Sequence, residues 1–160
     1  DTGSKAFQPS TPKLEDHYML SADDKSAIAE LLSRASYGYD ERDLKMLESC
    51  LCDDAVVSLR IAGGDLVGPF EGRDSIMQLY RDSMASQNDV RRHVVSNHLF
   101  SPSDVAVSEG AVDVVSNLTL FATEDGETRL LTTGVYRDVV RREGPSWCIA
   151  RRHVDLDSAY

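Results

Sequence analysis

The sequence lacks long hydrophobic runs and is poor in basic residues. No apolar stretch approaches the roughly 20 residues that a membrane-spanning helix needs, so we expect no membrane association. The chain has 17 Lys and Arg against 27 Asp and Glu, which gives a formal net charge of −10. Because this charge repels a phosphate backbone, nucleic acid is not an expected partner either. A neutral or apolar small molecule fits the composition better.

Cysteine is scarce, and the motifs of several enzyme classes are missing. Cys50, Cys52 and Cys148 have the spacing of neither a disulfide framework nor a zinc site, so we expect reduced, structural thiols. A Gly-rich phosphate loop, a nucleophile elbow and a His-Glu-x-x-His motif are all absent. We therefore expect no metal and no cofactor. The opening stretch has no secretory pattern, which favours a cytoplasmic location.

The chain has the size and composition of one domain. Its 160 residues are 41% hydrophobic and 28% charged, which is ordinary for a globular protein with a single core. Residues 1–20 mix Gly, Ser, Lys, Gln and two prolines without periodicity, so we expect a flexible N-terminal arm. Residues 21–160 then form the domain, without internal repeats or low-complexity segments.

Apolar residues at helical spacing predict three helices in the first half of the chain. The first begins at Ser21, which starts a near capping box, and ends near Tyr39. A second short helix is expected over residues 41–52, with Asp43 as its cap. The third follows Asp74 as its cap.

The second half of the chain is typical of strands separated by short turns. A first strand at 55–61 ends in a Gly-Gly turn, and four more are expected at 91–100, 105–121, 128–141 and 147–156. The run at 105–121 is long for one strand, so we expect a bulge or bend near Gly110. This order predicts an α+β fold in which a curved antiparallel sheet forms a cone and the N-terminal helices enclose an apolar pocket.

Acid-base chemistry is the reaction type for which the sequence offers candidates. Alternation along 91–100 places His93 and His98 on opposite faces of their strand. Asp40 lies at the junction of the first two helices, where capping is the other explanation for an acid. If Asp40 reached His93, its carboxylate would orient the ring and raise its basicity, as a general base requires.

A series of short motifs carries a resemblance to a known family. In chain order they are Tyr39-Asp40-x-x-Asp43-Leu44, residues 51–56, Gly68-Pro69-Phe70-Glu71-Gly72-Arg73, Arg92-His93-Val94-Val95-Ser96-Asn97, and Gly134-Val135-Tyr136 with Trp147-x-Ile149. From about residue 23 to 154 the chain resembles the nuclear transport factor 2-like superfamily, in its polyketide-cyclase and scytalone-dehydratase branch. Relatives in that branch use an Asp-His pair to move a proton during cofactor-free elimination.

The resemblance implies a function for three residues. Asp40 and His93 match the family's catalytic pair, and Tyr39 matches the tyrosine beside the aspartate in scytalone dehydratase. The implied activity is a cofactor-independent lyase or isomerase, of the dehydratase or cyclase type, acting on a hydrophobic cyclic molecule such as a polyketide, terpenoid or steroid. The resemblance also implies a homodimer or homotrimer that associates through the outer face of the sheet.

Further polar residues are candidates for substrate binding because they lie on or beside elements expected to line the cone. They are Asn97, Asn117, Tyr136, Tyr37, Arg151 and His153. Core packing is the other explanation for Tyr37, and a position at the rim is the other for Arg151 and His153. Two alternative functions stay open: a small structural subunit of an aromatic-ring dioxygenase, and a non-catalytic module that binds a small ligand.

Overall fold

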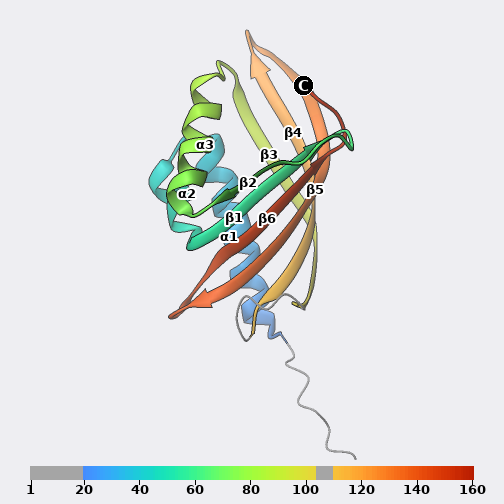
Figure 1. Ribbon diagram of the computed structural model, residues 1–160. Coiled ribbons are helices and arrows are strands. Elements are labelled where there is room, and N and C mark those ends of the chain that lie inside the picture. Colours follow the sequence, from blue (N-terminus) through green and yellow to red (C-terminus); the bar gives the residue numbers. More distant parts are fainter. Residues whose placement is uncertain (1–19, 104–109) are drawn as a thin grey trace, which may run out of the picture.

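The computed structural model describes residues 20–103 and 110–160, and within them the fold has the predicted α+β class. The elements are α1 (Ala22–Asp40), α2 (Leu44–Ser49), β1 (Leu51–Ile61), β2 (Val67–Glu71), α3 (Arg73–Ala85), β3 (Val90–Pro102), β4 (Val112–Glu124), β5 (Glu127–Glu143) and β6 (Ser146–Leu156). The strands form one curved, open sheet in the order β2-β1-β6-β5-β4-β3. The three helices lie together on one side of it (Figure 1). Nearly all of the predicted arm, residues 1–19, lies outside the described part of the chain.

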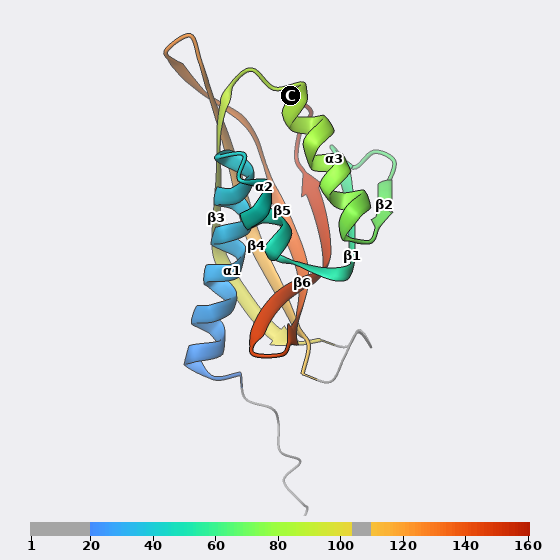
Figure 2. The same ribbon diagram turned by 90° about the vertical axis from the view of Figure 1, so that its left-hand side faces the viewer.

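One strand pair makes the sheet mixed. β1 and β6 run parallel, with Leu51 opposite Ile149 and Ile61 opposite Leu156. The other four neighbouring pairs are antiparallel, so the expectation of an antiparallel sheet holds for them and not for β1 with β6. The path of the chain explains the parallel pair. After β2 the chain passes through α3 to the opposite edge of the sheet, where it forms β3 (Figure 2). It then returns through β4 and β5, and β6 completes the sheet beside β1.

The helix starts follow the capping residues in two of three cases. The Ser21 side chain accepts a hydrogen bond from a backbone N–H in the first turn of α1, and Asp43 does the same for α2, as predicted. The prediction for α3 is wrong, because Gly72 precedes the helix and Asp74 lies within its first turn. The Arg73 side chain fixes this start by donating two hydrogen bonds to a carbonyl of β1.

Two of the β-bulges in the sheet change the orientation of residues that were candidates for the site. In β3 the pairing passes from Ser96 opposite Asn117 to Leu99 opposite Val115, and Asn97 has a left-handed backbone with φ of 57°. In β6, Ile149 pairs with Val140 of β5 and Arg151 pairs with Val139. Ala150 between them has no partner position on β5 and is the extra residue. Since side chains alternate along a strand, each bulge reverses the alternation beyond it.

The bend predicted near Gly110 comes before a strand rather than within one. Gly110 has a φ of 77° and lies in a turn, and β4 begins two residues later at Val112. Most of the first part of the predicted strand, residues 104–109, lies outside the described residues.

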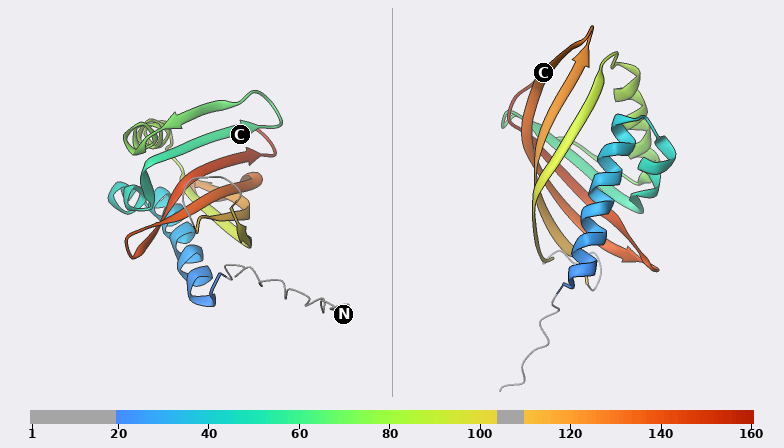
Figure 3. Two further views of the ribbon diagram at one scale, coloured as in Figure 1. Left: turned by 60° about the horizontal axis from the view of Figure 1, so that its bottom comes forward. Right: turned by 180° about the vertical axis from the view of Figure 1, so that it is seen from behind.

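The core lies between α1 and the inner face of the sheet, with α1 running beside β3 (Figure 3). Its fully buried members include Ile28 and Leu32 of α1, Ile76 of α3, and Val114 and Ile149 of the sheet. Burial of such side chains from water is the main force that holds helices and sheet together. In the described part of the chain, no helix is both long and apolar enough to cross a membrane.

A disulfide joins the beginnings of β1 and β6. Cys52 and Cys148 are bonded, with their Cα atoms 5.2 Å apart, and Cys50 remains a buried free thiol. The expectation of three reduced thiols is therefore wrong. The parallel pairing of β1 with β6 brings together two residues that are 96 positions apart in sequence. The same pairing takes Leu51 and Cys52 into β1, so the predicted second helix ends earlier, at Ser49.

Candidate active site

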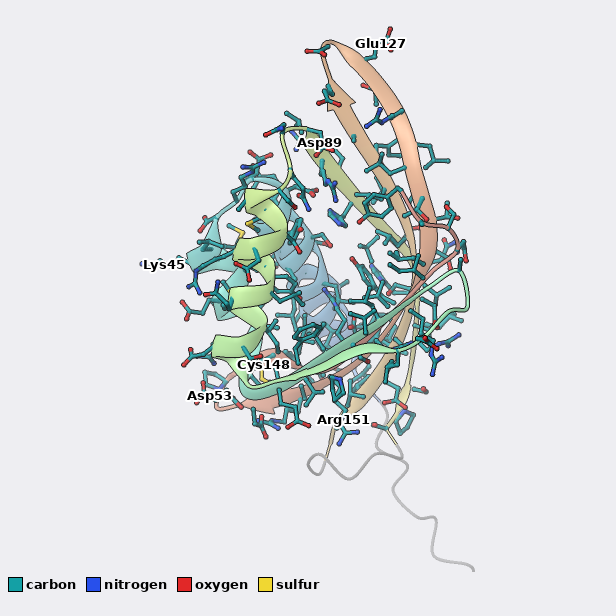
Figure 4. All side chains as sticks on the ribbon, turned by 45° about the horizontal axis from the view of Figure 1, so that its top comes forward. Lys45, Asp53, Asp89, Glu127, Cys148 and Arg151 are labelled. Carbon is teal, nitrogen blue, oxygen red and sulfur yellow. A yellow bond between two sulfur atoms is a disulfide. The ribbon has the colours of Figure 1, made fainter. Side chains whose placement is uncertain are left out.

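A cavity of about 180 Å³ opens between the helices and the inner face of the sheet. Most of its wall is apolar, with Leu118 and Leu120 among its buried members. Asp89 lies in the connection between α3 and β3 (Figure 4). Nearby, the Arg91 guanidinium lies 5.1 Å from the ring centre of Tyr160, which borders the cavity. An apolar cavity of about 150 Å³ holds benzene in an engineered lysozyme, so this cavity suits a compact ring system.

The structure brings Asp40 and His93 into contact. Asp40 is the last residue of α1, and its Oδ2 accepts a hydrogen bond from the backbone N–H of His93 at 2.8 Å. Its Oδ1 lies 2.5 Å from His93 Nδ1. The two side chains are 6% and 12% exposed, so water competes little for these bonds. One carboxylate therefore holds both the backbone and the ring of His93.

This contact determines which ring nitrogen of His93 can act on a ligand. A carboxylate only accepts hydrogen bonds, so Nδ1 carries the proton in the contact with Asp40. The neutral ring then presents the lone pair of Nε2, and His93 is part of the cavity wall. This is the arrangement of a general base oriented by an acid.

Tyr39 lies beside the pair. Its ring meets the His93 ring edge-on at 5.1 Å between centres and the Tyr80 ring at 5.6 Å. Its hydroxyl accepts a hydrogen bond from Gln87 Nε2 at 3.0 Å. Burial raises the pKa of Tyr39, so the phenol keeps its proton at neutral pH. Tyr39 is therefore placed as a proton donor next to His93.

A buried ion pair, which sequence reasoning missed, lies elsewhere along the same cavity. Arg152 donates from Nε and Nη2 to the two carboxylate oxygens of Asp138, at 2.7 and 2.9 Å. Its guanidinium also lies 4.4 Å from the ring centre of Tyr136. Burial by itself lowers the pKa of Arg152, but the charge and hydrogen bonds of Asp138 outweigh this effect and raise it. Arg152 and Tyr136 both line the cavity, which agrees with the predicted position of Tyr136.

A family model described as the SnoaL-like domain matches residues 21–153. The chain belongs to the SnoaL-like family. That family lies within the nuclear transport factor 2-like superfamily, so the resemblance proposed from the motifs is confirmed. A search of curated proteins finds no match.

Solved structures with the same fold include three that cover most of both chains. An NTF2-like protein with a cystatin-like fold from Novosphingobium aromaticivorans is 20% identical with a TM-score of 0.68, over 84% of this chain and 82% of that one. ActVI-ORFA from Streptomyces coelicolor is 16% identical with a TM-score of 0.67, over 83% and 97%. The beta subunit of a putative aromatic-ring-hydroxylating dioxygenase from N. aromaticivorans is 18% identical with a TM-score of 0.70, over 84% and 90%. At these identities the similarity establishes the fold of this SnoaL-like protein.

Three predicted substrate-binding residues lie outside the cavity of the SnoaL-like protein. Asn97 is exposed at the bulge of β3, and Asn117 is exposed because its neighbours Ser116 and Leu118 take the inner face. Tyr37 is 59% exposed, on the side of α1 opposite to the core. The predicted inward positions of all three are wrong. The bulge turns Asn97 outward, whereas strand and helix periodicity turn Asn117 and Tyr37 outward.

Arg151 and His153 are also on the outer side of the sheet. Figure 4 shows Arg151 pointing away from the helices. His153 is bound to Ser58 through Nδ1 at 2.8 Å and to Asp155 through Nε2 at 3.1 Å, outside the cavity. The bulge at Ala150 explains why these two predictions fail. It shifts the alternation by one residue, so that Arg152 faces the cavity and Arg151 and His153 face outward.

The bulge at Asn97 overturns the expected orientation of His98. Its Nδ1 lies 2.7 Å from Oγ of Ser116, which is completely buried on the inner face of β4. His98 therefore points to the same side of the sheet as His93 and not to the opposite side.

Residues with metal-binding side chains gather at one place in the described segments. They are Cys52, Glu143 and Cys148, and the two sulfur atoms are already joined in the disulfide. Disulfides persist mainly in oxidising compartments. The disulfide therefore does not support the predicted cytoplasmic location, which stays a prediction.

Proposed function

We propose that this SnoaL-like protein is an acid-base lyase or isomerase that acts on a compact hydrophobic ring compound and needs no cofactor. The contact of Asp40 with both the ring and the backbone N–H of His93 carries the proposal. It supports Nε2 of His93 as the base that removes a proton from a carbon next to a carbonyl group. The size of the cavity favours one or two fused rings, such as a small polyketide or terpenoid, over a larger steroid.

The three side chains supply what a dehydration requires. Nε2 takes the proton from the carbon, the C–H electron pair forms the new double bond, and the C–O bond to the leaving hydroxyl breaks. Tyr39 gives its proton to that hydroxyl, which departs as water, and the protonated His93 returns a proton to Tyr39. Without a leaving hydroxyl, return of the proton to another carbon gives an isomerisation. General acid-base steps of this kind contribute about 10²- to 10⁴-fold to rates.

The proposal is tested by exchange of α-protons for deuterium in compact cyclic ketones with one carbonyl in each ring, beginning with decalin-1,5-dione, followed by NMR in D₂O. His93→Ala removes the base. In Asp40→Asn the amide donates to Nδ1, which forces the proton onto Nε2 and abolishes its lone pair. Both variants should slow the protein-catalysed exchange by about 10²- to 10⁴-fold.

The matched control is His153→Ala, which removes a histidine from the outer face and should leave exchange unchanged. Equal exchange rates in the wild type, His93→Ala and Asp40→Asn would refute the role of the pair. So would a wild type that binds these ketones in the cavity without exchanging their protons.

A second candidate is a structural subunit without chemistry of its own. The fold similarity to a dioxygenase beta subunit favours it. Under that proposal, loss of Asp40 or His93 would leave assembly with a larger chain intact, and the wild type would show no exchange. Association of the chain into a homodimer or homotrimer also remains a prediction, for which sedimentation velocity is the direct measurement.

A further inference from the structure

A second polar cluster lies in the cavity away from the Asp40–His93 pair. We call it the inner subsite: Arg152 contacts Asp138 and Tyr136, and Ser36 of α1 lines the same cavity. Across the sheet, His93 stands opposite Leu120 of β4, whereas Tyr136 stands opposite Ser116. The two positions on β4 are four residues apart, which corresponds to about 13 Å along a strand. The cavity therefore has polar groups at two separate positions along its length.

Three groups of the inner subsite have hydrogen-bonding capacity that the described residues do not use. Ser36 is only 8% exposed, and its Oγ has no hydrogen-bond partner. The Tyr136 hydroxyl and Nη1 of Arg152 likewise make no hydrogen bond within residues 20–103 and 110–160, since Asp138 takes Nε and Nη2. About 90% or more of buried polar groups in proteins are paired, so the unpaired Ser36 Oγ is exceptional. Together with the two unused donors of Tyr136 and Arg152 on the same cavity wall, it indicates a position for a ligand atom.

The charges of the inner subsite indicate what kind of atom it accepts. The positive charge of Arg152 is matched by the carboxylate of Asp138, which is completely buried. A ligand anion would add an unmatched buried charge, which is costly. Burial also raises the pKa of Tyr136, so its hydroxyl remains a donor. The subsite therefore offers hydrogen-bond donors without a net charge.

We propose that the inner subsite binds an uncharged oxygen acceptor of the substrate, a ring carbonyl, remote from the carbon on which His93 acts. This inference rests on the proposed function for the identity of the reacting end. The substrate class is then a one- or two-ring compound with oxygen functions at both ends. Tyr136 and Arg152 donate to the carbonyl oxygen, and Ser36 adds a third donor from α1.

The test compares three probes of nearly equal shape by isothermal titration calorimetry: 1-tetralone, tetralin and 1-naphthoate. The wild type should bind the ketone about tenfold more tightly than tetralin, as the sum of modest hydrogen-bond contributions from the Tyr136 and Ser36 hydroxyls and Arg152. The carboxylate should bind more weakly than the ketone. In the Ser36→Ala/Tyr136→Phe double variant, which loses only hydroxyl groups, the ketone preference should fall to less than about threefold.

Two controls separate this proposal from the proposed function. Tyr37→Phe removes an exposed tyrosine hydroxyl from the same helix as Ser36 and should retain the ketone preference. His93→Ala should also retain it, although it loses proton exchange. If only His93→Ala abolishes the preference, the carbonyl binds at the Asp40–His93 end and the inner subsite is refuted.

Further outcomes would also overturn the inner subsite. They are equal binding of ketone and tetralin by the wild type, a preference that survives in the double variant, and tighter binding of the carboxylate. A wild type that shows the ketone preference but no proton exchange would leave the inner subsite standing and refute the proposed function.

Discussion

Removal of the Cys52–Cys148 disulfide is expected to cost a large part of the stability of this domain. The bond closes a loop across 96 positions of the sequence. The chain-entropy relation gives about 4.7 kcal/mol for a loop of about 100 residues, and removal of native disulfides typically costs about 2–5 kcal/mol. Since whole domains are stable by only about 5–15 kcal/mol, the loss is easily measured.

The assay is urea unfolding followed by circular dichroism, with wild type refolded with and without reductant. With a urea dependence of about 2 kcal/mol per molar, the midpoint should fall by about 1–2.5 M on reduction. Cys52→Ala/Cys148→Ala should behave like the reduced wild type, with a further small loss from the missing sulfur atoms. The control is Cys50→Ala, which deletes a buried thiol but keeps the bond, and should cost only about 1 kcal/mol.

Equal midpoints for oxidised and reduced wild type would refute this reasoning. The same holds if mass spectrometry finds that all three cysteines of the native protein, once denatured without reductant, react as free thiols.

Two further predictions follow from close packing and burial. Gly134→Ala should lower the free energy of unfolding by at least about 2 kcal/mol, because a Cβ there would clash with the backbone oxygen of Asp155 in the adjacent strand. An unchanged urea midpoint would contradict this prediction. Burial raises the pKa of Cys50, so thiolate forms only at higher pH than in an exposed cysteine. Ellman's reagent at pH 8 should therefore detect no reactive thiol in the native protein and one thiol after denaturation without reductant. A thiol that reacts quickly in the native protein would contradict this prediction.

Local patterns in the sequence were sufficient for most elements. The capping side chains of Ser21 and Asp43 act on backbone groups within one turn of themselves, so their effect does not depend on the rest of the fold. Strand positions followed from runs of β-branched and apolar residues between turns. The motifs around Asp40 and His93 also indicated the pair that the structure brings together.

Orientation of side chains was predictable only as far as the first bulge. Period-two alternation placed His98 and Arg151 on the wrong faces, because Asn97 and Ala150 each add one residue to a strand. A bulge depends on how one strand pairs with the next, which the strand's own residues do not reveal. For the same reason the inward position of Arg152 was missed.

The fold class, the family and the candidates for acid-base chemistry could be predicted from the sequence alone, since these depend on spacing within short segments. The strand register, and with it the Cys52–Cys148 bond, the Asp138–Arg152 pair and the residues that line the cavity, depends on the folded domain. Each of these joins residues on different strands or far apart in sequence. Their distances follow from packing of the whole domain, which no local pattern contains.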